Sequence, residues 1–69
     1  MRFNEEYRDY RIRYRRRRGW IANIWAPMSL FPLRDIPFAT EAEGKGVIEQ
    51  RTRKLIDAHI ANLKGDQNR

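Results

Sequence analysis

The sequence of 69 residues has no cysteine, and it has only one histidine, His59, and one serine, Ser29. The missing cysteines exclude disulfides and thiolate metal sites, and they suit a reducing compartment. His59 falls on the apolar side of an expected helix, and Ser29 falls in an expected loop beside no residue that could activate it. We therefore predict no catalytic residues, no metal site, no cofactor and no enzymatic activity.

Long apolar stretches are also missing. No segment approaches the ~18 apolar residues of a membrane span, and residues 1–6 lack the apolar core of a signal peptide. We therefore expect a protein of the cytoplasm without a membrane partner. The length allows one domain over residues 1–69, and a chain of this size buries only ~60% of its unfolded surface. The two ends, residues 1–6 and 65–69, are expected to fray.

Positive charge is distributed unevenly along the chain. Residues 1–34 contain nine of the 15 basic residues and three of the nine acidic ones, so they carry the whole formal net charge of +6. Residues 35–69 contain six of each sign. The excess is concentrated between Arg11 and Arg18, where arginine first alternates with apolar residues and then forms a run. An alternation with period two predicts a β-strand with one cationic face and one apolar face.

A second alternating segment follows the basic one. Between Trp20 and Ala26, every second residue is apolar and shares one parity. Residues 17–19 then fit a three-residue hairpin loop whose glycine takes the left-handed position. The predicted hairpin over residues 8–26 pairs Tyr14 with Ala22, which puts the apolar sets of both strands on one face.

Prolines and a helix-start motif organise the second half of the chain. Prolines at five-residue intervals from Pro27 to Pro37 exclude a helix, and residues 33–38 are predicted to form a short edge strand. Thr40-Glu41-Ala42-Glu43 matches a capping box and predicts a helix over residues 40–64. The predicted fold is a small α+β domain of β-β-β-α order, with an antiparallel sheet and one long C-terminal helix packed on one face.

The apolar residues on the inward faces define an expected core, and the helix contributes a stripe at helical spacing. The expected core consists of Tyr10, Ile12, Tyr14, Trp20, Ala22, Ile24, Ile48, Leu55, Ile56 and Leu63. Gly44 and Gly46 are expected to let the helix approach the sheet closely. The apolar loop residues Met28, Leu30 and Phe31 are expected either to fold over the end of the core or to form a contact surface.

The outward face of the hairpin is the candidate binding site. Arg11, Arg13 and Arg15 would lie ~6.6 Å apart along their strand, which suits a polyanion with regularly spaced charges. Asn23 and Trp25 beside them would add an amide that can read base edges and a ring that can stack. The candidate nucleic-acid-binding residues are Arg11, Arg13, Arg15, Arg16, Arg17, Arg18, Asn23, Trp25 and Arg34. The alternative explanation is charge that keeps a sheet edge soluble.

Three motifs along this segment are Tyr10-Arg11, Gly19-Trp20-Ile21-Ala22-Asn23-Ile24 before Pro27, and Phe38-Ala39-Thr40-Glu41-Ala42-Glu43. They resemble the plant ethylene-responsive-factor type of DNA-binding domain and the arm-binding domains of phage-type integrases. The resemblance implies a three-stranded sheet in the major groove, a helix behind it, and DNA contacts by Arg13, Arg15, Asn23 and Trp25. Asn23 and Trp25 replace the family's glutamate and arginine. The motif Gly19-Trp20-Ile21-Ala22 is also similar to HicB-type antitoxins, which implies a toxin protein as partner.

These features predict a nucleic-acid-binding module that contacts double-stranded DNA through the arginine-rich face of its sheet. The alternative is a protein-interaction module, antitoxin-like or a phage-type inhibitor, that uses the basic face on an acidic partner protein. A third reading is a homodimer formed through Met28, Leu30 and Phe31. DNA binding should weaken steeply with salt, whereas an inhibitor should copurify with one stoichiometric partner.

Overall fold

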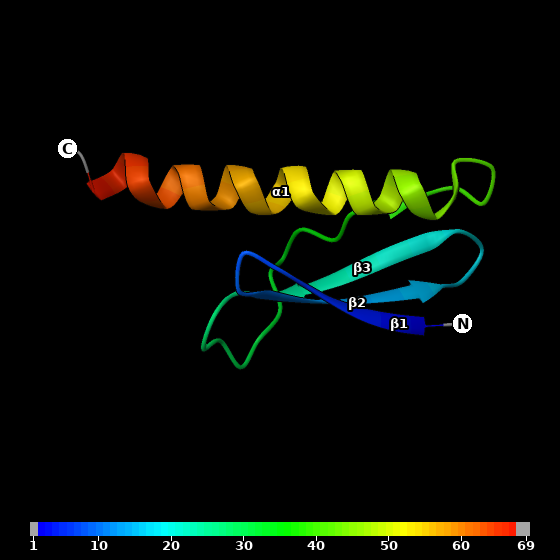
Figure 1. Ribbon diagram of the computed structural model, residues 1–69, viewed down its shortest axis with the longest axis horizontal. Helices are drawn as coiled ribbons and strands as arrows, with labels where there is room; N and C mark the ends of the chain where they lie inside the picture. The colour runs from blue at the N-terminus through cyan, green and yellow to red at the C-terminus, as the bar shows by residue number, and fades with distance from the viewer. Residues whose placement is uncertain (1, 68–69) are drawn as a thin grey trace.

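The computed structural model describes residues 2–67, which form four strands and a long helix (Figure 1). The elements in chain order are β1 Arg2–Tyr7, β2 Tyr10–Arg16, β3 Trp20–Trp25, β4 Phe38–Ala39 and α1 Gly44–Gln67. The strands form one antiparallel sheet in the order β1-β2-β3-β4. Because α1 lies across one face of this sheet, the protein is an α+β domain as predicted, with four strands rather than three.

The first strand corrects the prediction that residues 1–6 fray. From its second residue onward the chain is a strand that pairs with β2 along its whole length, ending at Tyr7 opposite Tyr10. Arg8 and Asp9 make the connection with φ of 51° and 69°. Two left-handed residues in a two-residue loop give the twist that a tight hairpin needs. The protein therefore has two consecutive hairpins, of which only the second was predicted.

The second hairpin has the predicted register, with Tyr14 opposite Ala22. Its loop is residues 17–19, and Gly19 has a φ of 127°. A Cβ atom at Gly19 would lie 2.7 Å from the carbonyl oxygen of Ala39. Glycine is thus required here twice, because the backbone is left-handed and because β4 passes against the loop.

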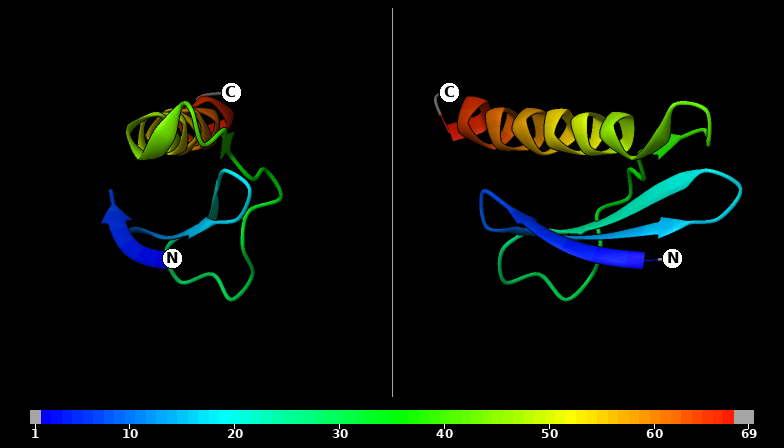
Figure 2. Two further views of the ribbon diagram at one scale, coloured as in Figure 1. Left: turned by 90° about the vertical axis from the view of Figure 1, so that its right-hand side faces the viewer. Right: turned by 45° about the vertical axis from the view of Figure 1, so that its right-hand side comes forward.

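The predicted edge strand over residues 33–38 is much shorter than expected. Only β4, Phe38–Ala39, pairs with β3. Residues 26–37 instead form a loop that descends past the sheet on the side away from α1 and then returns to the helix (Figure 2). The amide of Leu33 donates to the carbonyl of Ile24 at 2.7 Å and fixes the loop to β3. Proline lacks the N–H group of a strand ladder, which explains why regular pairing fails here.

The helix begins four residues later than predicted. The capping box does form, since the Thr40 amide donates to Glu43 Oε1 at 2.9 Å and the Glu43 amide donates to Thr40 Oγ1 at 3.1 Å. Gly44 then takes a left-handed φ of 83°, so the capping turn and α1 are separate units. Cβ atoms at Gly44 and Gly46 would meet nothing within 4 Å. The expectation that these glycines permit close helix–sheet contact is therefore wrong.

The core lies between the sheet and α1 and contains eight of the ten expected residues. The buried apolar residues are Tyr10, Ile12, Tyr14, Trp20, Ala22, Ile24, Ala39, Ile48 and Ile56. Thr52 is also buried, and its hydroxyl donates to the Ile48 carbonyl at 2.7 Å. Leu55 is only half-buried and Leu63 is 50% exposed. The C-terminal turns of α1 extend beyond the end of the sheet (Figure 1), and Leu63 is not among the residues packed against the core.

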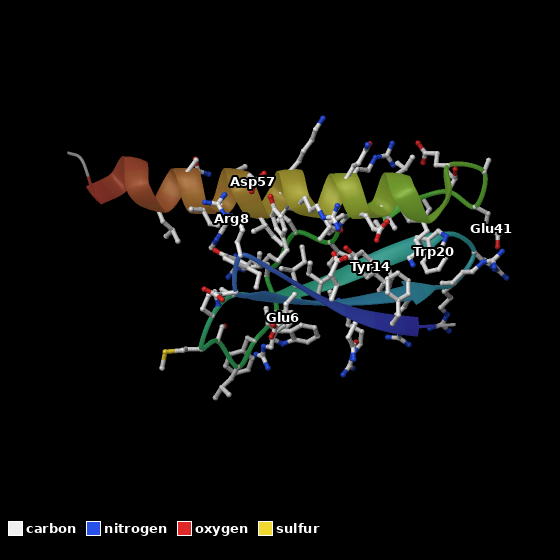
Figure 3. The ribbon with its side chains drawn as sticks, in the orientation of Figure 1. Glu6, Arg8, Tyr14, Trp20, Glu41 and Asp57 are labelled. Carbon is white, nitrogen blue, oxygen red and sulfur yellow. The ribbon has the colours of Figure 1, made fainter. Side chains whose placement is uncertain are left out.

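Polar side chains fasten β1 and its turn to α1 (Figure 3). Arg53 Nη2 donates to Glu5 Oε2 at 3.1 Å. At the turn, Asp57 Oδ1 accepts from Tyr7 Oη at 3.0 Å and from Arg8 Nη1 at 2.9 Å. Arg8 and Tyr7 lower the pKa of the Asp57 carboxyl because both donate to its charged form. These contacts hold β1 as a fourth, outer strand and so place β2 inside the sheet.

Candidate nucleic-acid interface

The sheet face that points away from α1 is called the outer face below. Strand β2 contributes Arg11, Arg13 and Arg15 to it, all exposed, while the residues between them are buried against α1. In register, Arg13 lies opposite Asn23 and Arg11 lies opposite Trp25. Five of the nine predicted site residues are therefore brought together as the alternation predicted.

The position of β2 in the sheet removes one explanation for its charge. On an edge strand, arginine can be explained simply by the need to prevent pairing with another chain. Strand β2 lies between β1 and β3, and the edges of the sheet are β1 and β4. The arginines of β2 thus protect no edge, and their concentration on one face calls for another reason.

Four arginines of the hairpin are the unneutralised part of the site. Among residues 3–63, no side chain forms an ion pair or a hydrogen bond with Arg13, Arg15, Arg17 or Arg18. We call these four residues the cationic row. By contrast, Arg11 Nη2 donates to the carbonyl of Ser29 at 2.9 Å and holds the loop after β3.

Two predicted site residues lie off the outer face. Arg16 has the inward parity of β2, packs over the Trp20 ring at 6.0 Å and approaches Glu41 at 3.6 Å. Arg34 belongs to the returning part of the loop and lines a small hollow with Leu55 and other helix residues. Neither can act together with the cationic row on one flat surface.

Three arginines on the helix side are neutralised, unlike those of the row. Arg51 forms a two-pronged contact with Glu43, with a shortest distance of 2.6 Å. Arg8 pairs with Asp57 at 2.9 Å, and Arg53 pairs with Glu5. These three arginines therefore add little net positive charge, whereas the four arginines of the cationic row stay unneutralised on the outer face and at the hairpin tip.

A groove opens on the outer face at the end of β2 opposite to the hairpin tip. It has a volume of about 620 Å³ and is lined by Asn4, Glu5, Glu6, Arg11, Ile12, Arg13, Trp25 and Leu30. The Arg13 guanidinium carbon lies 5.8 Å from the centre of the Trp25 ring, within the range of a cation–π contact. Glu6 lies on the outer face (Figure 3), and no side chain among residues 3–63 donates a hydrogen bond to its carboxylate.

Sequence reasoning missed Asn4, Glu6 and Leu30 as part of this groove. The first two were treated as part of a frayed end and the third as part of a loop. The alternation of Phe3, Glu5 and Tyr7 with polar residues was the available signal for a strand. It was weak because the middle inward residue is charged.

The loop between β3 and β4 displays apolar side chains beside this groove. Met28, Leu30 and Phe31 are 101%, 88% and 78% exposed. The loop itself is fixed, since the Ser29 amide donates to the Ala26 carbonyl at 3.1 Å and the Ser29 hydroxyl donates to the Phe31 carbonyl at 2.9 Å. These residues do not fold over the core, and their side chains are exposed on the surface of the loop.

The residues with acid–base chemistry lie on the helix side. Tyr10 Oη and His59 Nδ1 are 2.6 Å apart, with their rings edge to face. Burial raises the pKa of Tyr10, and burial together with the Glu5 hydrogen bond raises the pKa of Tyr14. Across residues 2–67, no cluster of histidine and carboxylate side chains could hold a metal ion. No helix in the same range has the length and apolarity of a membrane span.

Comparisons of this chain with protein families, with curated proteins and with solved structures find no match. The resemblance to DNA-binding sheet domains and to antitoxins therefore stays a prediction.

Proposed function

We propose that this protein is a nucleic-acid-binding module, without catalytic activity, that holds the phosphate backbone with its cationic row. Double-stranded DNA is the ligand that the resemblance implies, and the row would track its phosphates from Arg13 to the hairpin tip. Arginine suits this role because its planar fork donates to two phosphate oxygens at once.

The observation that supports this proposal most directly is the row of unpaired arginines on the inner strand β2 and on the loop that follows it. The sheet fixes the backbone spacing of Arg13 and Arg15, so the two charges already lie near the spacing that a polyanion needs. Carboxylates neutralise Arg8, Arg51 and Arg53 on the helix side, whereas no carboxylate among residues 3–63 pairs with the arginines of the row. Charge left unpaired in this way favours the release of counterions from a polyanion.

The test is a titration of fluorescently labelled duplex DNA, single-stranded DNA and RNA of equal length at two or more salt concentrations. Removing two phosphate contacts with Arg15→Gln and Arg17→Gln should reduce the slope of log K against log salt by up to ~1.8 for duplex DNA. Each of the two substitutions is also made singly and compared with Lys54→Gln, which removes one charge from the exposed side of α1. An equal loss of affinity in the control would point to unspecific attraction by net charge.

The exposed apolar loop favours a second candidate, an acidic protein partner. Such a partner would cover Met28, Leu30 and Phe31 and at the same time neutralise the row, which matches the mixed character of protein interfaces. No binding of any nucleic acid below ~100 μM in 50 mM salt would be weaker than ordinary non-specific binding. That result would put the protein partner first.

A further inference from the structure

We propose that the groove on the outer face is a subsite for one unpaired base, and that Glu6 selects guanine there. The inference rests on the proposed nucleic-acid binding and adds to it the part of the ligand that carries sequence information. Three features of the groove support it: its position relative to the cationic row, its stacking surface and the unpaired carboxylate of Glu6.

The groove continues the line of the cationic row. Arg13 is both the first residue of the row and a wall of the groove, and Arg15, Arg17 and Arg18 follow toward the hairpin tip. A strand whose phosphates follow the row would therefore bring its next nucleotide to the groove. A chain-like polyanion can follow these residues along the outer face. A flat anionic surface would meet the loop of residues 26–37 first, because this loop projects beyond the outer face (Figure 2).

The groove offers a base two apolar surfaces. Trp25, which is partly exposed, presents its indole ring. Leu30 lines the other side, and the hydrogen bond from Arg11 to the carbonyl of Ser29 holds the backbone that precedes it. Stacking on an aromatic ring is the usual way in which proteins hold a base that is not paired. The volume of about 620 Å³ lies in the range of small-ligand sites, which run from ~300 to ~1,000 Å³.

Glu6 is the unexpected residue, because a carboxylate on a phosphate-binding face repels the backbone. It lies opposite Arg11 in register, yet the two side chains form no ion pair, and Arg11 is committed to the loop. An ionised carboxylate accepts hydrogen bonds and cannot donate them. Guanine presents two adjacent donors on its Watson–Crick edge, whereas thymine and uracil present one donor between two carbonyl oxygens. The carboxylate thus favours guanine and disfavours thymine and uracil, and Asn4 beside it can serve the guanine carbonyl.

The test compares a ten-nucleotide single strand of thymidines with the same strand carrying one central guanine, inosine or 7-deazaguanine. Guanine should bind about tenfold or more tightly than thymine. Inosine, which lacks the amino donor, should lose most of this preference, and 7-deazaguanine, which keeps both donors, should retain it. Trp25 fluorescence should be quenched by the guanine strand, and Trp25→Phe should abolish the quenching because buried Trp20 is shielded.

Glu6→Gln should remove the preference for guanine while leaving the affinity for the thymidine strand equal or higher. Glu49→Gln, a matched change on α1, should leave both values unchanged. Both substitutions lie outside the core, and unchanged melting temperatures would confirm that each variant is folded.

Several outcomes would overturn the subsite. Binding that depends on length and salt but not on the base would overturn the subsite and leave the proposed function intact. Stronger binding of duplex DNA with no change in Trp25 emission would also overturn the subsite and leave the proposed function intact. Binding of anionic lipid vesicles with a blue shift of Trp25, and of no oligonucleotide, would overturn both the subsite and the proposed function.

Discussion

At the start of α1, two glycines only two positions apart have opposite requirements. Gly44 needs its left-handed φ of 83°, which an L-residue adopts at a cost, whereas Gly46 has no left-handed φ and open space around its Cβ position. Gly46→Ala should therefore stabilise the protein by ~0.4–1 kcal/mol, because it restricts the unfolded chain. Gly44→Ala should destabilise it. Urea denaturation of the two variants measures both effects, and effects of the same sign would contradict the assigned backbone.

A second pair of residues tests which part of the helix stripe supports the core. Ile56 is fully buried, and Leu63 is 50% exposed. Ile56→Ala should cost ~2–5 kcal/mol, a large part of the stability of a small domain. Leu63→Ala should change the free energy of unfolding by less than ~0.5 kcal/mol. Thermal denaturation followed by circular dichroism gives both values, and a similar loss in both variants would mean that the helix packs along its whole length.

Periodicity predicted the inward set of the hairpin correctly, but it selected two helix residues that the core does not fully include. The reason is that alternation along a strand directly separates the two faces of the sheet. An apolar stripe along a helix shows which side faces the core, but it does not show where the covering sheet ends. Leu63 continues the stripe after the sheet has ended. The length of the sheet relative to the helix depends on the tertiary arrangement, so it could not be read from local spacing.

Among the elements, the capping turn before α1 gives a defined dependence on pH. Hydrogen bonds from Arg51 and from the Thr40 amide lower the pKa of Glu43 from 4.5 to about 2. A carboxyl group whose pKa is lowered in the folded state stabilises the fold fully above its unfolded pKa, and this contribution disappears as the pH falls toward the folded value. Part of the stability should therefore be lost between pH 5 and pH 2.

Glu43→Gln tests this assignment. The variant should be less stable than the native protein at pH 7, and its melting temperature should fall less between pH 5 and pH 2. Glu41→Gln, two residues away, is the control, and it should keep the native dependence on pH. If the native protein and Glu43→Gln lose the same amount on acidification, the capping contacts do not supply the acid sensitivity.

The elements that the sequence failed to predict share a physical cause. Strand β1 has a charged residue, Glu5, at an inward position, and its stabilising contacts are made with Tyr14 and with Arg53, which lies 48 positions away. Strand β4 is shorter than predicted because the preceding segment is held to β3 by a single hydrogen bond from Leu33 to Ile24 and not by a ladder. Both outcomes depend on partners that only the folded chain brings together. The outward residues of β2 needed no such partners, which is why the candidate site was predicted better than the sheet that holds it.

In the whole molecule, the two layers separate the charges into two populations. Between sheet and helix, carboxylates from β1, the capping turn and α1 neutralise the arginines. On the outer face, the cationic row has no such partners within the described chain, and its members repel one another. The same arrangement that favours a polyanion therefore opposes folding in its absence, as net charge of one sign generally does.

The final prediction follows from this opposition. In the absence of ligand, Arg15→Gln combined with Arg17→Gln should raise the melting temperature at ~0.01 M salt, where the Debye length is ~30 Å, because the row then carries half its charge. The gain should vanish near ~1 M salt, where the Debye length is ~3 Å. A saturating polyanion should stabilise the native protein more than the variant, because ligand that binds only the folded state shifts the equilibrium by mass action. Lys54→Gln should show neither effect. If the variant is less stable than the native protein at low salt, these arginines support the fold. That result would contradict the proposal that the outer face is a binding surface.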